Sequence, residues 1–325
     1  MPLSAEDQRI RRLRPQPEQP RSLPDPTAPV GWLVEQERRS GVPGGEESVL
    51  TVFLAGAECP FTCVFCDLWR YAIPGPTAPG ALPAQLRRAL KESGPKSFDR
   101  IKLYNASNFF DPRAVPPEDL AELASLLAPF PAVTVESHAR MVGQRCQDFA
   151  AQLVGRLEVA IGLETIHPGA LPRLNKQMLL EHFSHAAAFL QNRGIDLRVF
   201  VLVGTPFVPA ALTVEWTVRS AEYALARGAR HVTVIPVRGG NGEMERLVAT
   251  GDFIPPTLRE LEAALIQSLP LVGSLQGPTV TADLWDVERL PACQSCREDR
   301  VERIREMNRT GASLPAVECP DCRAA

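Results

Sequence analysis

The sequence lacks any hydrophobic run that could cross a membrane. Among its 325 residues, the longest apolar stretch is residues 199–212, which is short for a membrane span and is interrupted by Gly204, Pro206 and Pro209. The first twenty residues also lack the apolar segment of a secretory signal. These absences predict a cytoplasmic protein that makes no contact with a membrane.

A strong net charge is also lacking. The formal charge is −3, so the surface as a whole has no attraction for polyanions. This weakens the case for nucleic-acid binding, although a local basic patch remains compatible with it. Residues 1–30 are rich in proline and charge, with the basic segment RIRRLR near the start. We expect a disordered or surface-draped arm here, in preference to an RNA-binding arm.

Disulfide bonds are not expected in a reducing compartment, and the eight cysteines therefore indicate metal binding or catalysis. Seven of them lie in tight clusters. Cys146 stands alone and is expected to be a small buried apolar residue.

The chain from residue 31 to 282 alternates short β-rich runs with amphipathic helical stretches. This rhythm predicts a parallel sheet built from βαβ units, either an open doubly wound sheet or a partial barrel. The expected strands are 49–54, 99–104, 132–136, 157–162, 197–203 and 231–237. Polar residues follow each strand, as they should at the carboxyl edge of a parallel sheet that binds a ligand.

Three cysteines follow the first of these strands with the spacing C-x3-C-x2-C, at Cys59, Cys63 and Cys66. Structural zinc usually takes four protein ligands, and ferredoxin-type clusters take four thiolates. Three thiolates on one loop leave one iron of a [4Fe–4S] cluster without a protein ligand. A catalytic metal site needs such an open position.

The loop ECPFTCVFC, with Phe65 just before its last cysteine, resembles the signature of the radical S-adenosylmethionine (SAM) superfamily. This resemblance implies a partial (β/α)6 TIM-type barrel and a [4Fe–4S] cluster whose fourth iron is chelated by the amino and carboxylate groups of SAM. It implies reductive cleavage of SAM to a 5′-deoxyadenosyl radical, and an electron donor of the ferredoxin or flavodoxin type.

The resemblance also assigns SAM-binding positions along the carboxyl edge. The segment YNASNFF occupies the place of a glycine-rich segment that holds the SAM amino group, although it lacks the usual Gly-Gly-Glu. The implied cofactor-binding residues are Phe65, Asn105, Ala106, Ser107, Glu136, Ser137, Glu164, Arg198, Gly204 and Val237.

A closer similarity covers roughly residues 30 to 325. The segments VESHAR, IGLET, LNKQ and GTPF resemble the radical SAM subunits of archaeosine synthase, within the group related to the catalytic subunit of Elongator. That family completes a modified 7-deazaguanine in tRNA together with a partner subunit. The similarity makes Lys176 and His138 candidates for substrate contact. The alternatives are a solvated residue at a helix start for Lys176 and a satisfied polar residue at a strand end for His138.

Two further functions remain open. The same radical chemistry could act on a small molecule or a peptide, or the chain could be a non-catalytic iron–sulfur or zinc scaffold or sensor that does not bind SAM.

The tail, residues 283–325, carries Cys293-x2-Cys296 and, 22 residues later, Cys319-x2-Cys322. Paired C-x2-C motifs predict a zinc site, and the rival interpretation is an auxiliary [4Fe–4S] cluster. The residues between the pairs are expected to form a polar helix that ends near Gly311.

Overall fold

A single sheet of eight strands organises the chain, in the order β1 to β8 along the sequence. The computed structural model describes residues 3–15, 24–42, 45–273 and 277–323. All neighbouring strands are parallel except β1, which runs antiparallel to β2. The strands are β1 Gly31–Arg38, β2 Glu46–Leu54, β3 Arg100–Asn105, β4 Ala132–Glu136, β5 Arg156–Glu164, β6 Asp196–Val203, β7 His231–Pro236 and β8 Thr279–Ala282.

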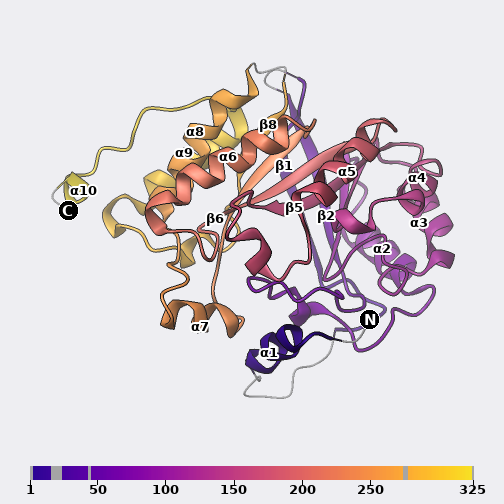
Figure 1. Cartoon of the computed structure of the whole chain (residues 1–325). Coiled ribbons are helices and arrows are strands. Elements are labelled where there is room, and N and C mark those ends of the chain that lie inside the picture. Colours follow the sequence, from indigo (N-terminus) through magenta and orange to yellow (C-terminus); the bar gives the residue numbers. More distant parts are fainter. Residues whose placement is uncertain (1–2, 16–23, 43–44, 274–276, 324–325) are drawn as a thin grey trace.

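Helices follow most strands and pack on the outer face of the sheet (Figure 1). Their contacts with the sheet include those of α2 with β2, α5 and α6 with β6, and α8 with β8. The helices are α1 Ala5–Leu13, α2 Ala81–Glu92, α3 Leu120–Leu127, α4 Gln144–Ala150, α5 Leu180–Gln191, α6 Thr213–Leu225, α7 Glu243–Ala249, α8 Leu258–Ser268, α9 Arg297–Thr310 and α10 Pro320–Arg323.

The sheet curls into a partial barrel, because side chains from distant strands meet across its inner face. Arg198 on β6 reaches Glu37 on β1, with 3.0 Å between Nη2 and Oε2. The ring of Phe53 on β2 lies 6.2 Å from that of Trp285, which follows β8. The predicted partial barrel is therefore confirmed. Its six expected strands are β2 to β7, whereas β1 and β8 were not predicted as strands.

Charged residues fill the amino-terminal half of the barrel. Arg198 also contacts Glu158, with 2.9 Å between Nε and Oε2, and Arg100 pairs with Glu47 at 2.7 Å. Lys102 completes the network from β3. Carboxylates can be buried here because each one meets a cation that offsets part of its desolvation.

The predicted role of Arg198 in cofactor binding is not supported by this placement. Arg198 is the third residue of β6 and lies away from the carboxyl edge, where the cysteine loop begins. Its guanidinium lies between the carboxylates of Glu37 and Glu158.

The amino-terminal arm is partly ordered, so disorder is wrong for residues 5–13, whereas the alternative of an arm that lies on the surface agrees with the structure. These residues form α1, which begins at a capping box between Ser4 and Asp7 and buries Asp7 and Ile10. Residues 1–2 and 16–23 of the predicted arm lie outside the described residues.

Two smaller predictions are confirmed at the other end of the chain and in the core. Helix α9 ends at Gly311, whose φ of 68° suits glycine. Cys146 is fully buried in the hydrophobic core.

Within the described residues, no helix is both long and apolar enough to span a bilayer.

We predict that Arg198→Met lowers the free energy of unfolding by about 3–5 kcal/mol, because Glu37 and Glu158 would lose their shared cation inside the barrel. The control is Arg156→Met, which removes the exposed pair between Arg156 and Asp196 and should cost no more than about 1 kcal/mol. Chemical denaturation of both variants measures the difference. Equal losses would contradict a central role for the interior network.

Candidate active site

The cysteine loop follows β2 and is fixed by hydrogen bonds from other parts of the chain. The backbone N–H of Val64 donates to the carbonyl of Leu174 at 3.0 Å. The amide Nδ2 of Asn241 donates to the carbonyls of Val64 at 2.8 Å and Cys66 at 3.2 Å. A loop without regular structure must satisfy its backbone groups in this way, and these bonds hold the three cysteines in place.

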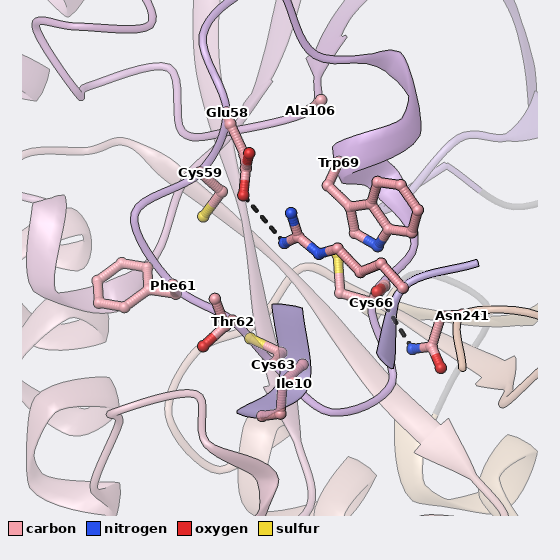
Figure 2. Close-up of a pocket in the computed structure, with 11 residues that line it drawn as sticks. Ile10, Glu58, Cys59, Phe61, Thr62, Cys63, Cys66, Trp69, Ala106 and Asn241 are labelled. Carbon is pink, nitrogen blue, oxygen red and sulfur yellow. Dashed lines mark hydrogen bonds and ion pairs between the residues drawn. The ribbon is translucent and has the colours of Figure 1, made fainter. Parts of the chain in front are cut away.

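The three thiols line one pocket at the carboxyl edge of the barrel (Figure 2). Burial raises the pKa of all three, to about 12 for Cys66. The thiols are therefore protonated at neutral pH until a metal displaces their protons. The amide of Asn108 donates toward the Cys59 sulfur at 3.4 Å. The other residues around the pocket are Ile10, Arg14, Glu58, Phe61, Thr62, Trp69, Ala106 and Asn241.

The donor set of this loop fits an iron–sulfur cluster. Its ligands are three soft thiolates from one segment, and soft thiolates select zinc, copper or iron–sulfur centres. Structural zinc usually takes four protein ligands, whereas a cluster with one open iron needs three thiolates. The residues present thus fit a [4Fe–4S] cluster.

Lys176 and Glu164 form a buried ion pair at the same edge, with 2.7 Å between Nζ and Oε1. Burial lowers the pKa of Lys176, but the charge and hydrogen bond of the Glu164 carboxylate outweigh burial and hold the pKa above its usual value. A Cβ on Gly162 would lie 2.0 Å from Glu164 Oε1 and 2.8 Å from Lys176 Nζ, so a larger residue here would displace the pair. The alternative of a solvated Lys176 is wrong, because the residue is 8% exposed.

The backbone around this pair is strained. Glu164, Asn175 and Gln177 have φ angles of 67°, 51° and 56°, in the left-handed region that side chains other than glycine rarely adopt. Such residues persist where the surrounding structure imposes them, and they gather at functional sites. Two of the three flank Lys176, so the segment presents this side chain in a fixed direction.

His138 joins three segments of the site. Its Nδ1 accepts a hydrogen bond from the backbone N–H of Arg140 at 3.1 Å, so its Nε2 carries the proton and donates to the carbonyl of Lys176 at 3.0 Å. Its ring stacks on Phe61 at 4.0 Å. Burial lowers its pKa to about 3. Because both ring nitrogens have protein partners, the geometry favours the satisfied polar residue over a catalytic histidine.

Some polar side chains after β3 and β4 already have hydrogen-bond partners in the protein, whereas others are able to bond to a ligand. Asn105 Oδ1 accepts from the backbone N–H of Ser107 at 2.9 Å and shapes the turn that brings Ala106 to the pocket. Ser107 Oγ is buried without a hydrogen-bond partner in the described part of the chain. Burial raises the pKa of Glu136 to about 8. Ser137 Oγ donates to the carbonyl of His138 at 3.3 Å.

Three further residues that the sequence predicts to bind the cofactor also pack in the structure, and their role in cofactor binding stays a prediction. Phe65 is partly buried against the hydrophobic core. Gly204 has a φ of 75° and lies where a Cβ would meet the Pro256 ring at 2.7 Å. Val237 is buried, and its backbone N–H donates to Val203 at 3.0 Å.

Sequence reasoning missed Asp7, Ile10, Thr62, Asn108 and Asn241, which all contact the cysteine loop or its pocket. The capping box from Ser4 to Asp7 was the one local signal that could have revealed α1.

The four tail cysteines form a second cluster of thiols. The sulfur atoms of Cys293 and Cys319 are 3.9 Å apart, and those of Cys296 and Cys322 are 3.7 Å apart. Arg300 on α9 donates to the Cys296 sulfur at 3.2 Å and also pairs with Glu262 on α8. The tail cluster is thereby linked to the last helix of the barrel.

No family model matches the sequence. The chain is 23% identical over 310 residues to archaeosine synthase subunit beta of Methanosarcina acetivorans. The aligned region covers 87% of this chain and 85% of that protein.

Among solved structures, the chain is similar to the archaeal Elp3 of Methanocaldococcus infernus with its N-terminus deleted. The TM-score is 0.51 and the identity 12%, over 79% of this chain and 63% of that one. A radical SAM methyltransferase from Sphaerobacter thermophilus gives a TM-score of 0.50 and 16% identity, over 79% of this chain and 76% of that one. Together with the three-cysteine loop, these comparisons confirm the predicted resemblance: the chain has the fold of the radical SAM enzymes.

Proposed function

We propose that this chain is a radical SAM enzyme in which Cys59, Cys63 and Cys66 hold a [4Fe–4S] cluster. The observation that carries the proposal is one pocket lined by three partly buried thiols from a single loop. Of the other cysteines, Cys146 lies in the core and four belong to the tail cluster, so none supplies a fourth thiolate to this pocket. When bound and reduced, the cluster supplies an electron to the sulfonium of SAM, which releases methionine and a 5′-deoxyadenosyl radical.

Residues of the carboxyl edge would orient SAM beside the loop. The Ser107 hydroxyl is buried without a hydrogen-bond partner among the described residues. The carboxyl of Glu136 has a pKa of about 8, so it can donate or accept a hydrogen bond near neutral pH. The Lys176 ammonium, held by Glu164, offers a fixed positive charge next to the thiolates. These three groups have the capacity to meet the polar groups of SAM.

For the substrate, we infer a 7-deazaguanine base in tRNA, as in archaeosine synthesis. The similarity to an archaeosine synthase subunit, over 87% of this chain and 85% of that protein, supports this inference. Inside the barrel, the ring of Tyr104 lies 6.4 Å from that of Phe53 in a tilted contact and 6.4 Å from that of Phe200 in an edge contact, and Trp285 is 59% exposed beside Phe53. A planar base can stack on such rings. The relative is named as a subunit, so a partner subunit is part of the proposal, as is a ferredoxin- or flavodoxin-type electron donor.

A small molecule or a peptide is the second candidate substrate, and the net charge of −3 is the observation that favours it. A non-catalytic scaffold or sensor is the third candidate function, and it would not cleave SAM.

Cys63→Ala is expected to abolish both the iron–sulfur absorbance of the loop site and the formation of 5′-deoxyadenosine, because the cluster would lose one of three thiolates. Anaerobically reconstituted protein with dithionite and SAM provides the assay. The control, Cys146→Ala, changes a thiol in the core and should retain product formation. Absence of 5′-deoxyadenosine from the unaltered protein would support the scaffold or sensor instead.

The tRNA proposal predicts binding to tRNA that weakens as salt rises, because protein contacts with phosphates release counterions. Trp285→Ala should lower the affinity about tenfold at fixed salt through the loss of one stacked base. The control is Trp216→Ala, since Trp216 contacts His167 and Arg219 and belongs to α6. Negligible tRNA binding at every salt concentration would favour a small substrate.

For the tail we propose one zinc ion bound by four thiolates. Zinc–sulfur bonds of about 2.3 Å in a tetrahedron place the sulfurs about 3.8 Å apart. The pairs at 3.9 and 3.7 Å match this spacing, whereas a [4Fe–4S] cluster binds each thiolate to a different iron and needs wider separations. The hydrogen bond from Arg300 to Cys296 is the kind of outer contact that orients a metal ligand.

We expect the triple variant with Cys59, Cys63 and Cys66 changed to alanine to contain one zinc and no iron per chain. Metal analysis of the purified protein measures both elements. Iron retained in the triple variant would contradict the zinc assignment and favour an auxiliary cluster.

A further inference from the structure

Helix α1 forms a side of the thiol pocket that the barrel does not supply. Ile10, on the inner face of α1, is 5% exposed and lines the pocket together with the three loop cysteines (Figure 2). Arg14, just after the helix, lines the same pocket, and its guanidinium lies 4.7 Å from the Trp69 ring. A segment from the start of the chain thus lies directly against the proposed cluster site.

One carboxylate ties α1 to two other parts of the site. Asp7 Oδ1 accepts hydrogen bonds from the Thr62 hydroxyl and from Asn175 Nδ2, the latter at 3.0 Å. Asp7 Oδ2 accepts from the backbone N–H and the hydroxyl of Ser4 at 2.8 and 2.7 Å. Thr62 lies between Cys59 and Cys63, and Asn175 precedes Lys176. Asp7 therefore joins the helix cap, the cysteine loop and the lysine segment.

Charged contacts hold α1 at other points along its length. Arg11 and Arg14 pair with Glu58, the neighbour of Cys59, at 3.0 and 2.9 Å. Arg9 pairs with the buried Glu243 at the start of α7, at 2.6 Å. The carbonyl of Leu13 also approaches Gly242 so closely that a Cβ there would lie 1.8 Å from it.

These contacts decide whether α1 exists at all. A helix of nine residues is not stable in water by itself, because nucleation costs more than so few hydrogen bonds return. When the contacts of Asp7 and Ile10 break, the helix should leave the pocket and unfold as a unit, independently of the barrel.

We propose that α1 is a cover of the cluster pocket, that it limits the access of solvent and oxygen to the three partly buried thiols and to the metal they would hold, and that Asp7 is the positioning residue that keeps it closed. The proposal rests on the function proposed for this pocket. Access to the thiols can be measured in protein without a cluster, so a failure of the cover and a failure of the radical chemistry are distinguishable.

The test is the rate at which iodoacetamide alkylates each cysteine in the full-length, cluster-free protein, read for each peptide by mass spectrometry. Asp7→Ala should raise the rates at Cys59, Cys63 and Cys66 by about tenfold or more, because it removes hydrogen bonds to a buried charged acceptor. Cys146, buried in the core, is the internal reference and should stay unreactive.

Matched variants sharpen the result. Asp7→Asn keeps an acceptor oxygen for Thr62 and Asn175 and should raise the rates less than Asp7→Ala. Ile10→Ala should raise them without removing a charge, whereas Arg12→Ala changes an exposed residue of the same helix and should leave them unchanged. In reconstituted protein, Asp7→Ala should also speed the loss of iron–sulfur absorbance in air.

The proposal would be overturned if each loop cysteine were alkylated at the same rate in Asp7→Ala and in Ile10→Ala as in the unaltered protein. So would a rise at Cys146 as large as that at Cys63, because the effect would then come from unfolding of the whole barrel.

Discussion

The hydrogen bonds to the loop between Cys59 and Cys66 are the constraint on which the rest of the site depends. They come from distant parts of the chain: Asp7 binds Thr62, Leu174 binds Val64, and Asn241 binds the carbonyls of Val64 and Cys66. The loop has no regular structure to satisfy its own backbone. The conformation of the loop, and with it the position of the three cysteines, therefore depends on segments that the fold brings together from distant parts of the chain.

Charge is arranged in two levels inside the barrel. The amino-terminal level is a network in which Arg198 lies between Glu37 and Glu158, so its cation is already neutralised. The carboxyl-edge level holds the Lys176–Glu164 pair, beside which the carboxyl of Glu136 has a raised pKa. The ion pairs of the amino-terminal level stabilise the curled sheet. At the carboxyl edge, Lys176 and Glu136 are groups that can form hydrogen bonds with a bound ligand.

The sequence was sufficient to predict the six central strands, the partial barrel and the cysteine loop at its carboxyl edge. These features follow from local patterns: β-rich runs, amphipathic spacing and clustered thiols. It could not show the ion-pair partners of Arg198, because the partners of an inward-facing arginine depend on how far the sheet curls and on β1, which the pattern did not reveal. It also could not predict α1, since this short polar helix depends on contacts with Thr62, Asn175 and Glu243 that are far away in the sequence.

We propose that three thiolates hold a cluster whose open iron binds SAM. Electron paramagnetic resonance of the reduced, reconstituted protein can test this, with SAM labelled by ¹⁵N in its amino group and ¹⁷O in its carboxylate. SAM should alter the cluster signal, and both labels should couple to it magnetically. A signal that SAM leaves unchanged, with no coupling to either label, would show that SAM does not bind the cluster.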